Sequence, residues 1–150
     1  MEPEQLEQYL HDHIPLSAAM QVSVREVQPD RVVLAAPLKP NINHRATVFG
    51  GSASALATLA AWSLVHVCLD TAGMSARLVI QHNSVDYQRP LTDDFIAIAT
   101  FKRPELWSRF LRGLVRRGRA RIVMAASLEQ GGRVAGHFEG TFVALDAKRA

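Results

Sequence analysis

The stretch Ser52–Leu69, SASALATLAAWSLVHVCL, decides the fold, because none of its eighteen residues carries a charge. A segment this long and this uncharged must be hidden from water, either in a bilayer or in the middle of a fold. The bilayer alternative is the weaker one, since the stretch is rich in Ala, and its Ser, Thr and His side chains are costly in hydrocarbon unless paired. The rest of the chain alternates like a sheet and offers no second span. We therefore predict a helix buried in protein on all sides and no membrane span.

Length and composition predict one domain over residues 1–150. The 150 residues and their apolar share of 48% suit a single globular domain with a proper core. The acidic N-terminus, MEPEQLEQYL, lacks the positive start and apolar core of a secretion signal. Cys68 is the lone cysteine, so no internal disulfide can form, and a reducing, cytoplasmic compartment is the expectation.

Six segments are predicted as strands, and the first two of them alternate polar and apolar residues with the period of a half-buried strand. The predicted strands are residues 20–27, 31–38, 77–87, 95–101, 119–128 and 133–145. Short helices are predicted at residues 2–13 and after Pro104, and a hairpin turn is predicted at residues 130–132. Glycines alternate with phenylalanines in the last strand, which predicts close approach to the buried helix. The order of elements predicts an α+β fold, an antiparallel sheet of about six strands wrapped around a long central helix.

Positive charge is concentrated between Lys102 and Arg121, a segment that contains eight Lys and Arg residues and one acidic residue, Glu105. Such a stretch could bind phosphates, either those of nucleic acid or those of a phosphorylated cofactor. A solvated face without a ligand is an equally good interpretation. The segment His11-Asp12-His13 resembles a metal site superficially, but no further ligands lie nearby in the sequence, so we expect no metal.

The pair Gly50-Gly51 stands immediately before the uncharged stretch. The first backbone N–H groups of a helix have no partner within the helix, and the positive end of the helix dipole favours negative charge. Glycine leaves those amides open because no Cβ blocks a ligand. The pair therefore predicts an oxyanion hole for a carbonyl oxygen, although it could also serve only as a tight turn into the helix.

Around this pair the chain resembles the hotdog-fold acyl-CoA thioesterases, particularly the PaaI-like enzymes. The matching positions are Asn43, Phe49-Gly50-Gly51, Leu56-Ala57-Thr58 and Tyr87-Gln88-Arg89-Pro90. The longer motif N-x-N-H-x-x-T-V-F-G-G-S, with Trp62 further along, is closer still to the thioesterase domain found behind acetyltransferase domains in YiiD-type proteins. The resemblance covers about residues 13–145. It implies a hotdog fold, hydrolysis of an acyl thioester with coenzyme A as part of the substrate and no other cofactor, and a homodimer or dimer of dimers with sites at the subunit junction.

Two positions depart from the family pattern. Phe49 stands where the family has His before the glycines, and Thr58 stands where it has a catalytic Asp on the helix. Threonine is no general base near neutral pH, so the resemblance supplies the oxyanion hole and leaves the base open. YiiD-type domains share both departures, which indicates a variant site.

The candidate catalytic residues are Asn43, His44 and Thr58. His44 could accept a proton from water, or it could be bonded structurally to the loop backbone. Asn43 could orient a water or donate to the carbonyl, or it could form a turn. Thr58 lies two turns into the helix and would assist.

The remaining candidates would bind the substrate. The acyl carbonyl would lie at Gly50 and Gly51, with Phe49 on the apolar wall. Ser52 could contact the substrate, although Ser52 and Thr47 could instead cap the helix. Asp86 could assist from across the site or be an exposed strand acid. The CoA phosphates could bind arginines, for which the candidates are Arg89, Arg103 and those between Arg109 and Arg121.

Three other functions remain open. The missing helix carboxylate would suit a non-catalytic acyl-CoA binding or sensor module on the same scaffold. Dehydration of a hydroxyacyl thioester generally needs a His in the position that Phe49 occupies. A nucleic-acid module would need aromatics interleaved with the arginines, and the spacing of Trp107 and Phe110 suits a packed helix face better, so no nucleic-acid partner is expected.

Overall fold

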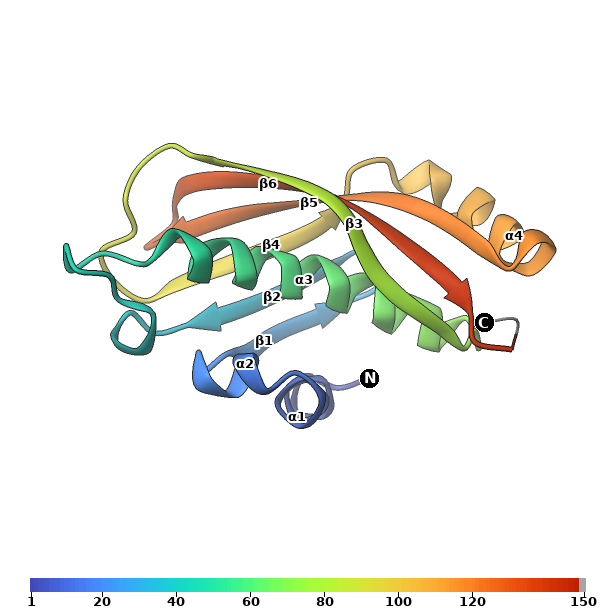
Figure 1. The fold of residues 1–150 in the computed structure, drawn as a ribbon, viewed down its shortest axis with the longest axis horizontal. Helices are drawn as coiled ribbons and strands as arrows, with labels where there is room; N and C mark the ends of the chain where they lie inside the picture. Colours follow the sequence, from blue (N-terminus) through green and yellow to red (C-terminus); the bar gives the residue numbers. More distant parts are fainter. Residues whose placement is uncertain (149–150) are drawn as a thin grey trace.

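The computed structural model describes residues 1–148 as a single curved sheet with helices on its inner side (Figure 1). The helices are α1 (Pro3–His13), α2 (Pro15–Ala19), α3 (Gly50–Thr71) and α4 (Trp107–Arg117). The strands are β1 (Ser23–Gln28), β2 (Arg31–Ala36), β3 (Ala76–Tyr87), β4 (Phe95–Phe101), β5 (Arg119–Gln130) and β6 (Arg133–Asp146). Short 3-10 turns precede the loop to α3 and helix α4, at Lys39–Asn41 and Pro104–Leu106.

Helix α3 is the core of the molecule, which confirms the prediction of a buried helix and not a bilayer span. It is not buried on all sides, however, because Ser54, Thr58, Trp62 and His66 are only half-buried. Its 22 residues make a rod about 33 Å long at 1.5 Å per residue. Residues at helical spacing along it are fully buried against the sheet, namely Leu56, Ala57, Ala60, Ala61 and Leu64. The small Ala side chains let the strands approach the helix closely. The helix stops where the sequence predicts, because Gly73 adopts the left-handed conformation with φ +72°.

The six strands form one sheet in the order β1-β2-β4-β5-β6-β3, with every neighbouring pair antiparallel. Its inner face curves around α3, which contacts five of the six strands. This is the predicted α+β hotdog arrangement. Strand β3 lies at one edge, where it is bonded to β6 only. The hairpin between β5 and β6 turns at Gly131 and Gly132, both with positive φ, as the sequence predicts.

The glycines of β6 serve a different purpose from the predicted one. A Cβ on Gly136 would lie 2.7 Å from the backbone oxygen of Asp86, in the neighbouring strand β3. A Cβ on Gly140 would lie 2.6 Å from the ring of Phe138 and 3.2 Å from that of Phe142. These glycines therefore make room for a strand backbone and for two phenylalanine rings, and α3 is not among their nearest neighbours.

Two further helices lie on the inner side of the sheet. Helix α1 buries Leu6 and Leu10 completely, and its Tyr9 stacks on His66 of α3 at 4.7 Å between ring centroids. Helix α4 joins the same core through Phe110 and Leu114. Figure 1 shows α4 at one end of the molecule, while the first residues of α3 lie at the other.

The N-terminal part differs from the prediction in one respect. The first strand begins at Ser23 and not at Met20, because the short helix α2 ends at Ala19 and the turn that closes it occupies the next residues. Gln21 closes α2 with a left-handed backbone, φ +58°, and Val22 donates its N–H to the carbonyl of Ser17. Met20, Val22 and Val24 are all buried, as the alternation predicts, but only Val24 lies in strand β1.

Candidate active site

The N-terminal tip of α3 carries two backbone donors without a protein acceptor. Phe49 is the N-cap residue, and no side chain caps this helix end, so Thr47 and Ser52 do not act as caps. The amides of Ser52 and Ala53 both donate to the carbonyl of Phe49. Within residues 1–148, the N–H groups of Gly50 and Gly51 donate to no carbonyl or side chain. Two free amides at the positive end of a long helix are suited to bind an oxygen with negative charge.

A cavity of about 330 Å³ lies beside this tip. Its wall comes from the loop before α3, the first turn of α3, the end of β3 with the segment that follows it, and the parts of β5 and β6 next to their hairpin. The lining residues are Thr47, Val48, Gly50, Ala53, Tyr87, Gln88, Arg89, Pro90, Leu91, Leu128 and Ala135. Its inner wall is apolar and closed, since Ala53, Leu128 and Ala135 are buried. Tyr87, Arg89 and Thr47 supply polar groups nearer the surface. The cavity can therefore hold a small apolar group with a polar end at the helix tip.

Tyr87 and Phe49 define the two sides of the tip. The Tyr87 hydroxyl donates to the carbonyl of Gly50 at 3.0 Å, and a Cβ on Gly50 would lie 3.7 Å from the tyrosine ring. The Phe49 ring is 58% exposed and lies over Gly51, where a Cβ would be only 2.3 Å from it. Gly50 thus borders the cavity directly, whereas Gly51 lies under the Phe49 ring and must be glycine for that ring to stay there.

The loop before the helix is held by Asn43. Its side-chain amide donates to the Thr47 hydroxyl at 2.8 Å, and its side-chain oxygen accepts from the backbone N–H groups of Arg45 and Thr47. These bonds are those of a turn-forming asparagine. His44 lies at the exposed tip of the same loop, where its ring contacts Arg45 at 3.4 Å, and it does not line the cavity. The structure therefore keeps both residues near the tip but outside the cavity wall.

Thr58 lies two turns into α3 and is half-buried. Its hydroxyl donates to the carbonyl of Ser54, one turn earlier in the same helix, at 2.8 Å. The Thr58 oxygen can still accept a hydrogen bond from a ligand or a water. Ser52 is also half-buried at the tip, on the first turn of the helix. Neither residue lines the cavity.

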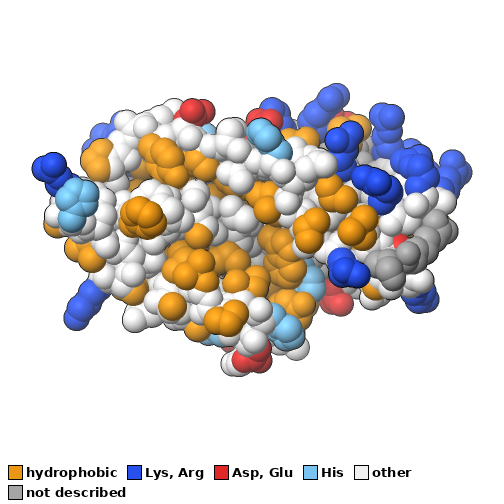
Figure 2. Space-filling model, in the orientation of Figure 1, with side chains coloured by type: hydrophobic (Ala, Val, Ile, Leu, Met, Phe, Trp, Pro, Cys, Tyr) orange, Lys and Arg blue, Asp and Glu red, His pale blue; other side chains and the backbone are white. Residues whose placement is uncertain are grey.

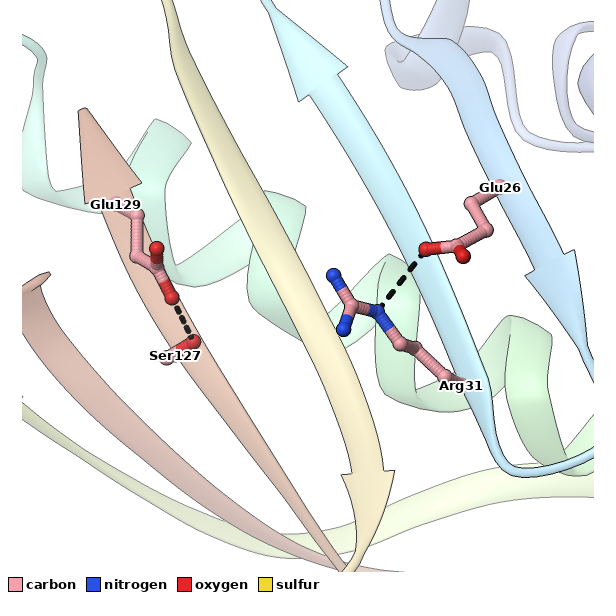
Figure 3. Close-up of polar contacts among 4 residues, drawn as sticks. All are labelled: Glu26, Arg31, Ser127 and Glu129. Carbon is pink, nitrogen blue, oxygen red and sulfur yellow. Dashed lines mark hydrogen bonds and ion pairs between the residues drawn. The ribbon is translucent and has the colours of Figure 1, made fainter. Parts of the chain in front are cut away.

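Asp86 is on the other face of the sheet from the cavity. It stands directly opposite His137 on β6, while its neighbour Tyr87 points inward to Gly50. Asp86 and His137 line a separate cavity of about 410 Å³ on the outer face. Figure 3 shows that face, with α3 behind the strands. There the Ser127 hydroxyl donates to Glu129, and Arg31 pairs with Glu26. The structure therefore does not bring Asp86 together with the helix tip.

The two predicted phosphate-binding arginines are separated. Arg89 lines the cavity at the tip. Arg103 follows the far end of β4 and pairs with Glu105 at 3.2 Å, both exposed. A further cavity of about 510 Å³, lined by Arg117, Arg119, Ala120 and Arg121, lies where α4 meets β5. Figure 2 shows Lys and Arg side chains gathered at this end of the molecule.

Most of the side chains that line the cavity were not predicted as site residues from the sequence, and Tyr87 and Leu128 are the two that define its shape. Tyr87 was part of the Tyr-Gln-Arg-Pro motif, but only the fold brings its hydroxyl to Gly50. Leu128, at 1% exposure, closes the cavity from β5. The alternation of residues in β5 shows that the Leu128 side chain points inward. Nothing in the sequence, however, places it at the same cavity as Gly50, about eighty positions earlier in the chain.

Neither the cysteine nor a metal cluster adds chemistry to this site. Burial raises the pKa of Cys68 to about 11, and its thiol lies 3.2 Å from the carbonyl of Pro29, to which it donates. The thiol is therefore protonated near neutral pH and is a poor nucleophile. Among residues 1–148, no three His, Cys, Asp or Glu side chains are grouped to hold a metal ion.

Comparison with known proteins agrees with the fold. Residues 3–146 match the family model described as "Putative thioesterase (yiiD_Cterm)". A protein of unknown function from Chlorobaculum tepidum is 27% identical, with a TM-score of 0.89 over 96% of this chain and 94% of that one. A protein from Shewanella oneidensis described as a putative thioesterase is 25% identical, with a TM-score of 0.84 over 95% and 96%. A thioesterase from Haemophilus influenzae shares the fold at 14% identity, with a TM-score of 0.78 over 97% and 92%.

Proposed function

The chain belongs to the YiiD_C thioesterase family, and on that basis we propose that it hydrolyses acyl-CoA thioesters at the tip of α3. One observation carries the proposal. The free amides of Gly50 and Gly51 stand at the positive end of a 22-residue helix, and Gly50 borders a cavity with an apolar inner wall. Such donors stabilise the negative charge that develops on a carbonyl oxygen when water attacks it.

The acyl group would occupy the cavity, with its carbonyl oxygen at the Gly50 amide. Val48, Leu91 and Leu128 supply apolar contact, and Arg89 lies at the polar side. The thiolate is a good leaving group, so the reaction does not demand a strong general acid. The attack still needs a water that loses a proton, and no Asp, Glu or His lines the cavity. His44 is the proposed base, with Asn43 and Thr58 positioning the water.

The second candidate function is a non-catalytic acyl-CoA binding module. It is favoured by the absence of a carboxylate from the cavity wall and by the Thr58 hydroxyl, which donates to the helix backbone. Such a module would use the same amides and the same cavity to hold an intact thioester. Turnover separates the two functions, because both predict binding but only the first predicts release of thiol.

We also propose that two copies associate through their β3 edges. Every second residue of the twelve in β3 directs its backbone N–H and C=O groups to the outer edge, where no strand pairs with them, and Val79 and Ile80 of this strand are exposed. Exposed sheet edges are blunted by Pro, by charged residues, especially Lys, or by β-bulges; β3 contains no Lys or Pro, although it has a bulge between Ile80 and His82. An antiparallel partner strand would satisfy the ladder and cover the two apolar side chains. The cytoplasmic location expected from the lone cysteine remains a prediction.

The test is release of free thiol from short, medium, long and aromatic acyl-CoAs, combined with substitution of Gly50. Gly50→Pro removes one amide donor at the first helical position, where proline is tolerated, and Phe49 already has a compatible ψ of 130°. We expect kcat to fall about 10²-fold or more. Gly50→Ala is the matched control, because it keeps the N–H and its Cβ makes an ordinary contact with Tyr87. Equal activity of the two variants would exclude the Gly50 amide from catalysis. Binding without turnover by the unaltered protein would favour the module.

A further inference from the structure

A second cavity lies at the opposite end of α3 from the proposed carbonyl site. Its volume is about 410 Å³, and its wall comes from the end of β1 with the turn that follows, the last turns of α3, and the first residue of α4. It shares no lining residue with the cavity beside Gly50. Among residues 1–148, no charged side chain lines it. The proposed hydrolysis therefore leaves this cavity without a role.

The wall of this second cavity is apolar and poor in water. Val67 is 5% exposed, and Val27, Cys68 and Trp107 are half-buried. The pKa of Cys68 points to the same surroundings, because burial raises it to about 11, with a smaller contribution from the charge of Asp30. A cavity of this size with mostly apolar walls is typical of sites that bind small molecules.

The side chain of Trp107 is held in place by rings that lie outside the cavity. It stacks on Phe110 at 5.1 Å between ring centroids and forms an edge contact with Phe101 at 5.3 Å. Neither of these two phenylalanines lines the cavity. Because these contacts fix the ring, the aromatic part of the wall is formed before a ligand arrives, which lowers the entropic cost of binding.

Hydrogen-bond acceptors lie on one side of the cavity, at the end of α3. The last carbonyl groups of a helix have no partner inside it. The turn that follows α3 donates its N–H groups to three of them, those of Cys68, Leu69 and Asp70. Within residues 1–148, the carbonyls of Thr71 and Ala72 accept no hydrogen bond, and both residues line the cavity. A ligand with a hydrogen-bond donor would therefore find an acceptor that the fold leaves open.

From these features we infer that the cavity binds a small neutral molecule with an aromatic body and one hydrogen-bond donor. At about 30 Å³ per non-hydrogen atom, 410 Å³ holds roughly fourteen such atoms. The aromatic body would pack against Trp107, and the donor would bond to the carbonyl of Thr71 or Ala72. A charged ligand is disfavoured, because it would enter apolar surroundings without an oppositely charged side chain. The inference does not depend on the proposed hydrolysis.

The first test compares indole with 1-methylindole in calorimetry on the full chain. The two probes have nearly the same shape and are smaller than the cavity, but only indole has an N–H donor. We expect indole to bind about fivefold more tightly, as the gain of one hydrogen bond predicts. Equal affinities would overturn the assigned ligand class. A protein that binds no indole at millimolar concentrations would overturn the site itself.

The second test locates the bound probe through Cys68, which is the only cysteine of the chain. Its side chain lines the cavity, so bound indole should slow alkylation of the thiol by N-ethylmaleimide. The mass of the intact protein measures the extent of alkylation over time. An unchanged rate at saturating indole would place the probe elsewhere and overturn the inference.

The third test fills the cavity. Val67→Phe extends a lining side chain into it, and indole affinity should fall about tenfold or more. Ala72→Trp does the same from an exposed position, so it keeps the test available if Val67→Phe does not fold. Ala19→Trp is the matched control, because Ala19 is also exposed but does not line the cavity, and it should keep full affinity. Unchanged indole affinity in the folded cavity variants would overturn the assignment.

Discussion

The Tyr87 hydroxyl donates to the carbonyl oxygen of Gly50 at 3.0 Å, which ties the last residue of β3 to the first residue of α3. The bond orients the first peptide groups of the helix, whose amides are the proposed oxyanion donors. It also places the tyrosine ring along the cavity wall. An edge strand and the central helix are therefore joined at the point where the carbonyl would bind.

Tyr87→Phe should lower kcat/KM as well as stability. The substitution keeps the ring and removes one exposed hydrogen bond, which contributes about 0.5–1.5 kcal/mol to stability. We expect kcat/KM for acyl-CoA to fall about five- to tenfold, because a less firmly held tip binds the developing charge less well. Steady-state kinetics and urea unfolding of the same preparation check this. If only stability changes, the bond has no role in orienting the tip.

Leu128→Ala should shift the preferred acyl-chain length of the proposed thioesterase reaction towards longer chains. At about 30 Å³ per non-hydrogen atom, the share of a water molecule in the liquid, the 330 Å³ cavity holds roughly ten such atoms. Removing most of the Leu128 side chain deepens it. The variant should lose about 2–5 kcal/mol of stability, as buried leucines do when truncated. Ratios of kcat/KM across a series of straight-chain acyl-CoAs measure the preference.

Leu34→Ala is the control for that experiment. Leu34 is also fully buried, but it lies in β2 and does not line the cavity. It should cause a similar loss of stability with no change in the preferred chain length. A shift of equal size in both variants would mean that loosening of the core, and not cavity depth, sets the preference.

Gly51→Ala should disturb the tip through Phe49. The new Cβ would stand 2.3 Å from the phenylalanine ring, so the ring must leave its position. We expect an altered KM for acyl-CoA with little loss of stability, since the ring is largely exposed. Gly51→Ala combined with Phe49→Ala removes the clash and should behave like Phe49→Ala alone. Non-additive kinetics in this double-mutant cycle would confirm the contact, and strictly additive kinetics would contradict it.

Stability should fall as the pH drops below about 6.5, because of His66. Burial lowers the pKa of His66 from its ordinary 6.5, while Asp70 opposes this shift and His13 adds to it. A lowered pKa in the folded state means that the unfolded chain binds the proton more readily. The free energy of unfolding therefore decreases from pH 6.5 down to the folded-state pKa and is flat with respect to this group below it.

His66→Gln should remove that part of the pH dependence, whereas His82→Gln, at an exposed position of β3, should leave it in place. Urea unfolding of both variants between pH 7.5 and pH 5 makes the comparison. The hypothesis fails if the slope survives in His66→Gln.

The sequence predicted the arrangement of elements better than it predicted the site. The long run without charge located α3, and the alternation of polar and apolar residues indicated strands such as β1 and β2, because burial constrains every second residue of a half-buried strand. This pattern could not place Asp86, since β3 is exposed on most positions and its alternation does not distinguish the faces. The bulge between Ile80 and His82 adds a further change of face that no local pattern reveals. The bonds that commit Asn43 to its loop likewise depend on the conformation of that loop.

What the sequence by itself determined is a long uncharged helix, the strands that must cover it, and two glycines that leave its first amides open. These follow from local chemistry, because charge, periodicity and the absence of a Cβ act within a few residues. Only the tertiary structure decided that Tyr87 bonds to Gly50, that Leu128 closes a cavity beside them, and that Arg117, Arg119 and Arg121 lie together where α4 meets β5. Those facts depend on which strands become neighbours, and strand order is set by contacts between residues distant in sequence.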